Sequence, residues 1–245
     1  MLNITKLKNC STNESDLTIN PLFYAMEGNQ FKTPTFEELK SSFATAAEII
    51  REKFPKAKII EYEDVHFHAA FELIKSISGQ NEKEIEFLIK AVPLVVTDVP
   101  ALELTKIESE IIRIAQETKL DLKSLSVLTV LSRLYDNGRS GYNVAKRILK
   151  PNSEYTKENA YNTLADLNAL RLFIGFLALS ESNKYESFAF CTSDKALVLL
   201  WSGFNFYDIK FVKDVGARSS FSLSENLFPR LSQDQRIELA AKLSQ

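Results

Sequence analysis

Two aspartates carry the strongest indication of chemistry in this sequence. Asp166 interrupts an apolar helical pattern at residues 164–170. Asp194 follows a short apolar segment at residues 187–191, which is typical of a strand, and precedes a helical pattern at residues 195–201. A carboxylate at the C-terminal end of a strand, facing a second carboxylate on a neighbouring helix, is a common arrangement for holding a divalent metal ion.

Each aspartate also has an ordinary structural explanation. Because burying an unpartnered carboxylate is costly, Asp166 is expected either to pair with Arg171 or to face solvent. Asp194 is well placed to cap the helix that follows it, since an aspartate side chain accepts the first free amide groups of a helix. The sequence leaves the metal site and these alternatives open.

The composition bounds the class of protein. A chain of 245 residues is long enough to bury a large core, and its net charge of −2 lacks the basic excess of many nucleic-acid-binding proteins. The two cysteines, Cys10 and Cys191, suggest neither a disulfide framework nor a cysteine metal site, which favours a reducing compartment. The N-terminal residues 1–9 have no sustained apolar core, and the most apolar run, residues 172–179, is too short to span a membrane, so we expect a cytoplasmic protein without a membrane partner. The sequence contains neither a G-x-G-x-x-G pattern nor a P-loop pattern. This absence counts against the two classes of nucleotide-dependent enzymes that use these patterns.

The periodicity of apolar residues positions these aspartates within an α/β protein. Strands are predicted at residues 17–26, 57–62, 187–191 and 208–212. Helices are predicted at residues 35–54, 82–92, 155–180, 195–201 and 234–243, and residues 64–149 have a helical pattern that a loop at residues 136–141 interrupts. Strands separated by helices predict a parallel sheet flanked by helices. We therefore expect a single domain, residues 1–245, with a large helical insertion at about residues 64–150.

Short motifs around the two aspartates resemble the PIN-domain family of nucleases. In that family a helix that carries an aspartate precedes a strand ending in Thr-x-Asp, and the acids gather around magnesium or manganese. The matching positions here are Asp166 on the helix and Thr192, Ser193 and Asp194 after the strand.

The N-terminal part of the family pattern is matched less completely. The family begins with a strand ending in Asp-x-Asn, and here Asn20 takes the asparagine position while Thr18 replaces the aspartate. The family's glutamate on an early helix has no counterpart in the closest segment, residues 126–134. Two of the four expected carboxylates are therefore missing, and the acids that could substitute for them are Asp16, Glu27 and Glu108.

The resemblance implies a PIN-like α/β fold and metal-dependent hydrolysis of RNA phosphodiester bonds. It assigns Asp166 and Asp194 as catalytic ligands of Mg²⁺ or Mn²⁺, and it assigns Asn20, Thr192 and Ser193 to substrate binding. The missing acids favour a weak or degenerate activity, because fewer carboxylates bind a cation less strongly. The alternative is a catalytically inactive PIN-like α/β protein that acts as a binding module for a protein partner.

Two further groups of residues have both a functional and a structural interpretation. His66 and His68 suit a zinc or iron site in an extended chain, but the segment resembles the start of a helix, where the two rings diverge. The basic residues Lys146, Arg147 and Lys150 are placed to contact phosphate, although a solvated helix face explains them equally well.

Overall fold

The computed structural model describes residues 15, 17–26, 34–136, 138, 143–180, 192, 194–212 and 216–244. The chain divides into two compact units, Met1–Asn81 and Glu82–Gln245. Helix α3, Asp64–Ala91, runs across the boundary between them. The single domain predicted from the sequence stays a prediction.

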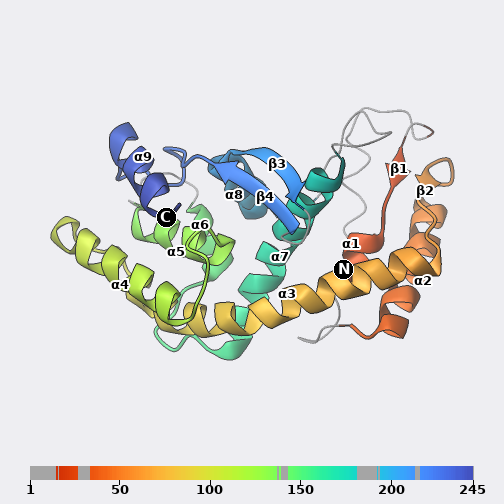
Figure 1. Cartoon of the computed structure of the whole chain (residues 1–245), viewed down its shortest axis with the longest axis horizontal. Coiled ribbons are helices and arrows are strands. Elements are labelled where there is room, and N and C mark those ends of the chain that lie inside the picture. The colour runs from red at the N-terminus through yellow and green to blue at the C-terminus, as the bar shows by residue number, and fades with distance from the viewer. Residues whose placement is uncertain are drawn as a thin grey trace. The chain divides into compact units, whose positions relative to one another are not determined.

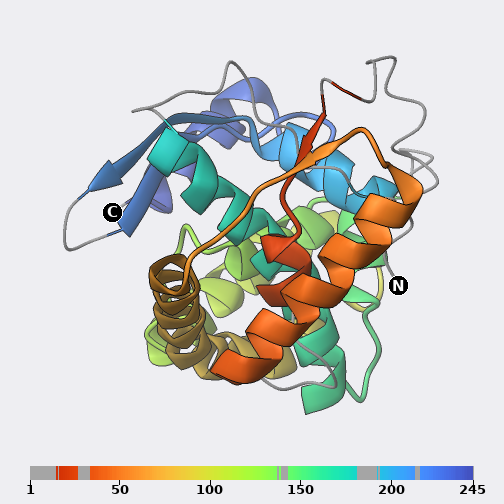
Figure 2. The same ribbon diagram turned by 90° about the vertical axis from the view of Figure 1, so that its right-hand side faces the viewer.

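The first unit contains a small parallel sheet and its covering helices. Strand β1, Thr18–Ile19, pairs in parallel with β2, Lys58–Ile59. Helix α1, Leu22–Met26, lies beside α2, Phe36–Lys53 (Figure 2). The predicted start of α2 is confirmed, because Thr35 and Glu38 form a reciprocal capping box.

The predicted strand at residues 17–26 is wrong in its second half. The side chain of Asn20 accepts a hydrogen bond from the backbone N–H of Leu22 (3.0 Å), and the carbonyl of Pro21 accepts one from Ala25 (3.2 Å). An asparagine followed by proline starts a helix well, since the amide oxygen caps a free N–H and proline fixes a helical φ. The strand therefore ends after two residues and α1 begins.

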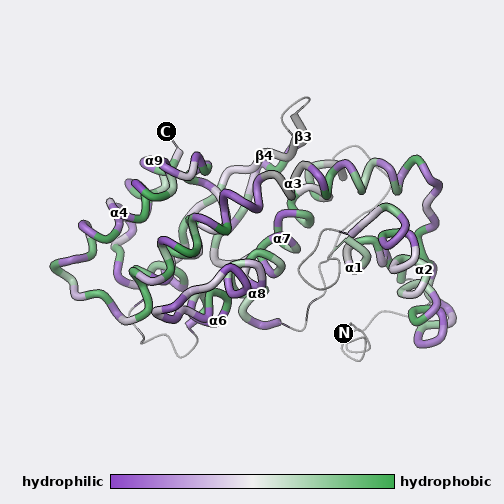
Figure 3. The backbone as a smooth tube through the Cα atoms, turned by 90° about the horizontal axis from the view of Figure 1, so that it is seen from below, coloured by the Kyte–Doolittle hydropathy of each residue, from purple (hydrophilic) through white to green (hydrophobic). Residues whose placement is uncertain are grey.

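The second unit is mainly helical and surrounds one apolar core. Helix α5, whose ten residues are all buried, lies within this core, and Figure 1 shows the elements in order along the chain. Figure 3 shows hydrophobic and hydrophilic residues alternating along α4, which buries Ile111, Ile114 and Ala115. The helices and 3₁₀-helices are η3 Val92–Val95, η4 Ala101–Glu103, α4 Leu104–Glu117, α5 Leu125–Leu134, α6 Val144–Leu149, α7 Lys157–Ser180, α8 Lys195–Phe204 and α9 Gln233–Lys242.

An antiparallel hairpin completes the second unit. Strand β3, Phe206–Val212, pairs with β4, Gly216–Phe221, and the hairpin lies against α7 (Figure 1). The strand predicted at residues 208–212 is thus confirmed, but its partner is antiparallel. The strand predicted at residues 187–191 lies outside the described residues.

The structure is mixed α/β and mostly helical, with a two-stranded parallel sheet. The helical character predicted for residues 64–150 is confirmed, although the helix predicted at residues 82–92 is the second part of the continuous α3. A PIN-like arrangement of the sheet stays a prediction. Within the described ranges, no helix combines the length and apolar character needed to cross a membrane.

A buried ion pair connects α3 to α7. Glu84 is fully buried, and its carboxylate accepts hydrogen bonds from Arg171 Nη2 (2.6 Å) and from Ser126 Oγ on α5 (2.8 Å). Arg171 also donates to Asn168 on its own helix (2.6 Å). Removing one partner of a buried pair leaves the other charge without compensation, so this pair fixes which side of α7 faces α3.

We predict that Arg171→Met lowers the free energy of unfolding by about 3–5 kcal/mol, because it leaves the Glu84 carboxylate buried and unpaired. The double variant Glu84→Gln/Arg171→Met should recover at least half of that loss, since a neutral amide still accepts from Ser126. Urea unfolding followed by circular dichroism measures both.

The matched control is Lys90→Met, which breaks the exposed Lys90–Glu86 pair (2.6 Å) on α3. An exposed pair of this kind contributes about 0.5 kcal/mol or less. An equal loss in Lys90→Met and Arg171→Met would contradict the assignment of the buried pair.

Candidate functional site

Three helices of the second unit surround the two aspartates. Helix α6 packs against α7 and α8, and α7 packs against α8. The side chain of Thr163 on α7 donates to the carbonyl of Ile148 at the end of α6 (3.2 Å). Its hydroxyl also shares a hydrogen bond with the hydroxyl of Tyr155 (2.7 Å), so the connection from α6 to α7 is held against this turn of α7. Asp166 lies one turn further along.

Aromatic packing aligns α7 with α8. The rings of Phe173 and Trp201 are in edge contact with centroids 5.0 Å apart, and Trp201 also contacts Phe206 on β3 (5.1 Å). Asp166 precedes Phe173 by seven residues, and Asp194 precedes Trp201 by the same number. Residues seven apart lie on nearly the same side of a helix, about 10 Å apart along its axis. The charge of Asp194 acts on the Asp166 carboxyl, so the two aspartates lie near each other in the α7–α8 pair.

Asp166 is half-buried, and the charges of Lys150 and Asp194 act on its carboxyl. The pKa of this carboxyl is raised to about 6, mainly by burial; the charge of Lys150 lowers the pKa and the charge of Asp194 raises it. Among the described residues, none forms a hydrogen bond or ion pair with this carboxylate. Asp166 is therefore a carboxylate whose charge is unfavourable in the folded protein alone.

The pair with Arg171, one of the two structural alternatives for Asp166, is wrong, and Asp166 is partly exposed. Arg171, the expected partner, binds Glu84 and Asn168 instead. Successive residues of a helix are turned by about 100°, so positions 166 and 171 lie about 140° apart around α7. A helix that directs Arg171 toward Glu84 directs Asp166 away from it.

Asp194 caps α8, as its alternative interpretation predicts. Its Oδ1 accepts hydrogen bonds from Ala196 N–H (2.7 Å) and Leu197 N–H (3.3 Å). Its own N–H donates to Thr192 Oγ1 (3.1 Å), so Thr192 shapes this turn. Asp194 is exposed, and within the described part of the chain its Oδ2 takes no hydrogen bond. Capping therefore leaves one oxygen of the carboxylate for a ligand.

The donor set suits a weakly held hard cation. Two carboxylates supply oxygen ligands of the type that Mg²⁺ and Mn²⁺ prefer, and Mg²⁺ is commonly held by one or two carboxylates together with water and substrate phosphate. In the described parts of the chain, no group of three or more His, Cys, Asp or Glu side chains is arranged to hold a metal ion. Among the described residues, Asp166 and Asp194 alone make up the expected donor set, and the binding of a cation by them stays a prediction.

The remaining residues predicted from the sequence are not all placed at this site. Asn20 belongs to the first unit, where its Nδ2 donates to Tyr62 OH (2.7 Å) and its Oδ1 caps α1. Ser193 lies outside the described residues. Of the three acids that could substitute for the missing carboxylates, Glu108 is bound by Tyr135 OH and by Lys242 (2.6 Å), and the other two, Asp16 and Glu27, also lie outside the described residues.

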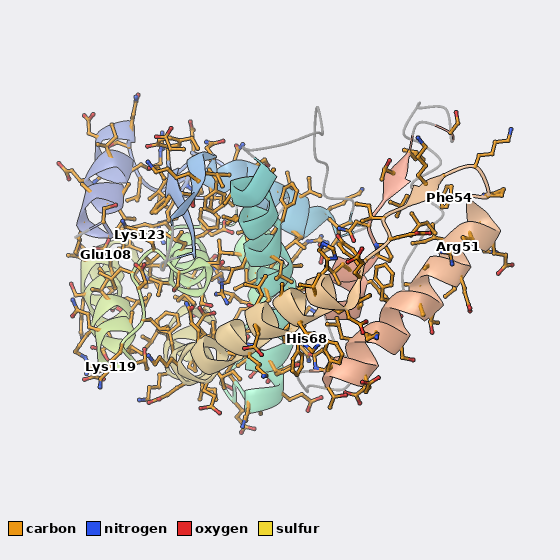
Figure 4. The ribbon with its side chains drawn as sticks, turned by 45° about the vertical axis from the view of Figure 1, so that its right-hand side comes forward. Arg51, Phe54, His68, Glu108, Lys119 and Lys123 are labelled. Atoms are coloured by element: carbon orange, nitrogen blue, oxygen red, sulfur yellow. The ribbon has the colours of Figure 1, made fainter. Side chains whose placement is uncertain are left out.

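The two histidines do not form a joint site. The predicted helix start is confirmed, since α3 begins at Asp64. His66 Nδ1 accepts from the N–H of Glu63 (3.1 Å), and the ring of His68, labelled in Figure 4, stacks on Phe36 with centroids 4.2 Å apart. Each histidine therefore has its own structural contact.

Lys150 belongs to the basic group that the sequence analysis named as a possible phosphate contact, but the sequence did not connect it to Asp166. Its charge lowers the pKa of the Asp166 carboxyl. The signal that could have identified it is its position immediately before Pro151, at the end of a short helix that leads into α7.

Comparison with known proteins identifies no relative. No family model, no curated protein and no solved structure matches the chain. The residues of the site are therefore the basis on which a function is proposed.

We predict that Asp166→Asn stabilises the protein at pH 8 by about 1–3 kcal/mol, because it removes a buried charge whose pKa is raised from 3.8 to about 6. The contribution of Asp166 to the free energy of unfolding of the wild type should be largest below pH 4. It should fall as the pH rises from about 4 to about 6, because the carboxyl then ionises in the folded protein. The gain from the substitution should therefore be absent at pH 4. Urea unfolding across this pH range measures it.

The control is Glu158→Gln, which removes an exposed carboxylate from the first turn of the same helix. Its effect on stability should not grow between pH 4 and pH 8. An Asp166→Asn variant that is no more stable than wild type at pH 8 would show that the carboxylate carries no such cost.

Proposed function

We propose that this protein is a PIN-like, divalent-metal-dependent ribonuclease of low activity, in which Asp166 and Asp194 hold Mg²⁺ or Mn²⁺ and RNA phosphodiester bonds are hydrolysed. The observation that carries the proposal is that the half-buried Asp166 carboxylate, which forms no hydrogen bond or ion pair with the described residues, lies within the influence of a second carboxylate, that of Asp194. Two like charges in this arrangement oppose folding, and a divalent cation between them would offset the repulsion. The cytoplasmic location expected from the two cysteines is part of the same proposal.

The residues of the chain have distinct roles in this mechanism. Asp166 supplies a carboxylate in a partly desolvated position, where its attraction for a cation is stronger than in water. Asp194 supplies the oxygen that capping leaves open, and the turn closed by Thr192 fixes its direction. When bound, a divalent cation polarises a phosphate and lowers the pKa of an attacking water. A low activity follows from having two carboxylates instead of four.

An inactive PIN-like binding module is the second proposal. It is supported by the same shortage of acids and by the net charge of −2, which gives no general attraction for RNA. In this case Asp194 acts as a helix cap, and the partner is a protein. The two proposals differ in whether a cation binds to the aspartates.

We predict that millimolar Mn²⁺ raises the melting temperature of the wild-type protein by roughly 3–6 °C. A cation at ten times its dissociation constant contributes about 1.4 kcal/mol, which corresponds to that shift for a chain of this size. The shift should be lost in Asp166→Asn and in Asp194→Asn. Asparagine caps a helix nearly as well as aspartate, so Asp194→Asn tests metal binding without removing the cap.

The matched control is again Glu158→Gln, which should retain the full shift. Differential scanning fluorimetry at pH 7.5, with and without EDTA, makes the measurement. An unchanged melting temperature in wild type with Mn²⁺ would reject the nuclease and leave the binding module.

We predict slow, EDTA-sensitive cleavage of single-stranded RNA by the wild-type protein in Mn²⁺. Either aspartate variant should lower the rate at least tenfold, because each removes a ligand of the cation that stabilises charge in the transition state. Gel analysis of an end-labelled RNA measures the rate. Cation binding without any cleavage would support the inactive module.

A further inference from the structure

The β3–β4 hairpin has two faces of different character. Cross-strand partners in a hairpin share a face, and successive residues of a strand alternate between the two faces. The register pairs Phe206 with Phe221, and the ring of Phe206 lies against Trp201 of α8 with centroids 5.1 Å apart. This face is therefore turned toward the helices, and the opposite face is turned away from them.

A β-bulge brings a tyrosine and two basic residues together on the outward face. Tyr207 pairs with Ser220, and Lys210 pairs with Arg218. The two partners on β4 are two residues apart, so they share a face. Tyr207 and Lys210 are three residues apart on β3, and they share a face only because the register shifts between them. These four residues are named the outer hairpin face.

The ring and the lysine of the outer hairpin face are open to solvent. Tyr207 is 52% exposed, and Lys210 is exposed as well. Within the described ranges, neither side chain forms a hydrogen bond, an ion pair or a ring contact. Packing inside the protein therefore does not account for the presence of an aromatic ring beside basic residues on this surface.

The two basic residues are placed unfavourably for the hairpin alone. Residues directly opposite each other have Cβ atoms about 5 Å apart, and like charges at such positions destabilise a sheet. Lys210 and Arg218 occupy opposite positions, and the two strands contain one acid, Asp208, against them. An anion bound between the basic residues would replace their repulsion by attraction. Phosphate suits this place, because both arginine and lysine bind it.

The tyrosine indicates that the phosphate belongs to a nucleic acid. Tyr207 and the basic pair are separated by about 7 Å along the strands, a distance on the scale of one nucleotide. Proteins that bind single strands combine aromatic rings, on which the bases stack, with basic residues that follow the phosphates. The faces of the bases are open to such a ring in a single strand, whereas neighbouring bases cover them in a double helix.

We propose that the outer hairpin face binds single-stranded RNA, with a base stacked on Tyr207 and a phosphate held by Lys210 and Arg218. The choice of RNA rests on the proposed function, whereas the ring and the basic pair do not depend on the two aspartates. The hairpin packs on α7 and, through Trp201, on α8, which are the helices that carry those aspartates. It supplies locally the attraction for RNA that the net charge of −2 lacks.

Binding of a fluorescently labelled oligouridine RNA, followed by anisotropy in EDTA, tests the role of the ring. Tyr207→Val should raise the dissociation constant on the order of tenfold, because it removes the surface on which a base stacks. Tyr207→Phe is the matched control and should bind as the wild type does, since it keeps the ring.

The same measurement at several salt concentrations tests the basic pair. Lys210→Gln and Arg218→Gln should each weaken binding at low salt. Each should also reduce the slope of log K against log salt by about 0.7, the contribution of one phosphate contact on a single strand. The control is Lys123→Gln, which removes an exposed lysine from the connection between α4 and α5 (Figure 4) and should leave the affinity unchanged.

The melting temperature separates a lost contact with RNA from a lost fold. Lys210→Gln and Arg218→Gln each remove one of two opposed like charges, so each should melt at or above the wild-type temperature. Tyr207→Val places a residue that strands favour at an exposed position, so the hairpin should be kept. A variant that melts as the wild type does and binds RNA less tightly has lost a contact with the RNA.

Several outcomes would overturn the inference. The first is the absence of RNA binding by the wild type, and the second is wild-type affinity in Tyr207→Val or in both basic variants. An equal affinity for a polyglutamate peptide of the same charge would assign the surface to an acidic protein segment instead of RNA.

The use of EDTA keeps this inference separate from the proposed function. Hairpin-dependent RNA binding in EDTA, without any Mn²⁺-induced rise in melting temperature, would reject the metal-dependent nuclease and keep the RNA-binding surface. A rise with Mn²⁺ and an RNA affinity that none of the hairpin variants changes would keep the proposed function and reject the surface.

Discussion

The structure of the second unit depends on the need to pair one fully buried carboxylate, that of Glu84. Arg171 meets this need from α7 and Ser126 from α5, so three helices are connected through a single side chain. Because a helix is rigid in rotation, an arginine held on one side of α7 determines where every other residue of α7 faces. Asp166 is placed on the side of α6 and α8 for this reason, and the site is a consequence of a pairing that takes place elsewhere on the helix.

The elements around Asp166 then convert this orientation into a chemical arrangement. Thr163 holds the end of α6 against α7, and the contact between Phe173 and Trp201 sets the level of α8. The outcome is a carboxylate that is expensive to ionise, with one neighbour that opposes its ionisation and one that favours it. Such a carboxylate opposes folding when it is ionised, and carboxylates with a raised pKa are enriched at functional sites.

The sequence predicted individual elements better than their assembly. Local signals placed α2, α7 and α8, because capping residues and helical periodicity act over a few neighbouring positions. The segment after Ile19 was predicted as a strand because its residues are mostly apolar, although Asn20 and Pro21 favour the start of a helix. The Asp194 cap was predicted for the same local reason, whereas the pairing of Arg171 with Glu84 joins residues 87 positions apart and has no local signal.

The two hydrogen bonds that Asp194 accepts at the start of α8 make the backbone amides of Ala196 and Leu197 sensitive to any ligand of Asp194. A ligand drawing on the free oxygen of the carboxylate must also withdraw electron density from the oxygen that holds Ala196 and Leu197. The amide protons of Ala196 and Leu197 would then resonate at different frequencies, and exchange with solvent at different rates, in the ligand-bound and ligand-free protein. Nuclear magnetic resonance of these two backbone amides in isotope-labelled protein would thus report whether a ligand is bound, without a dye and without turnover of a substrate.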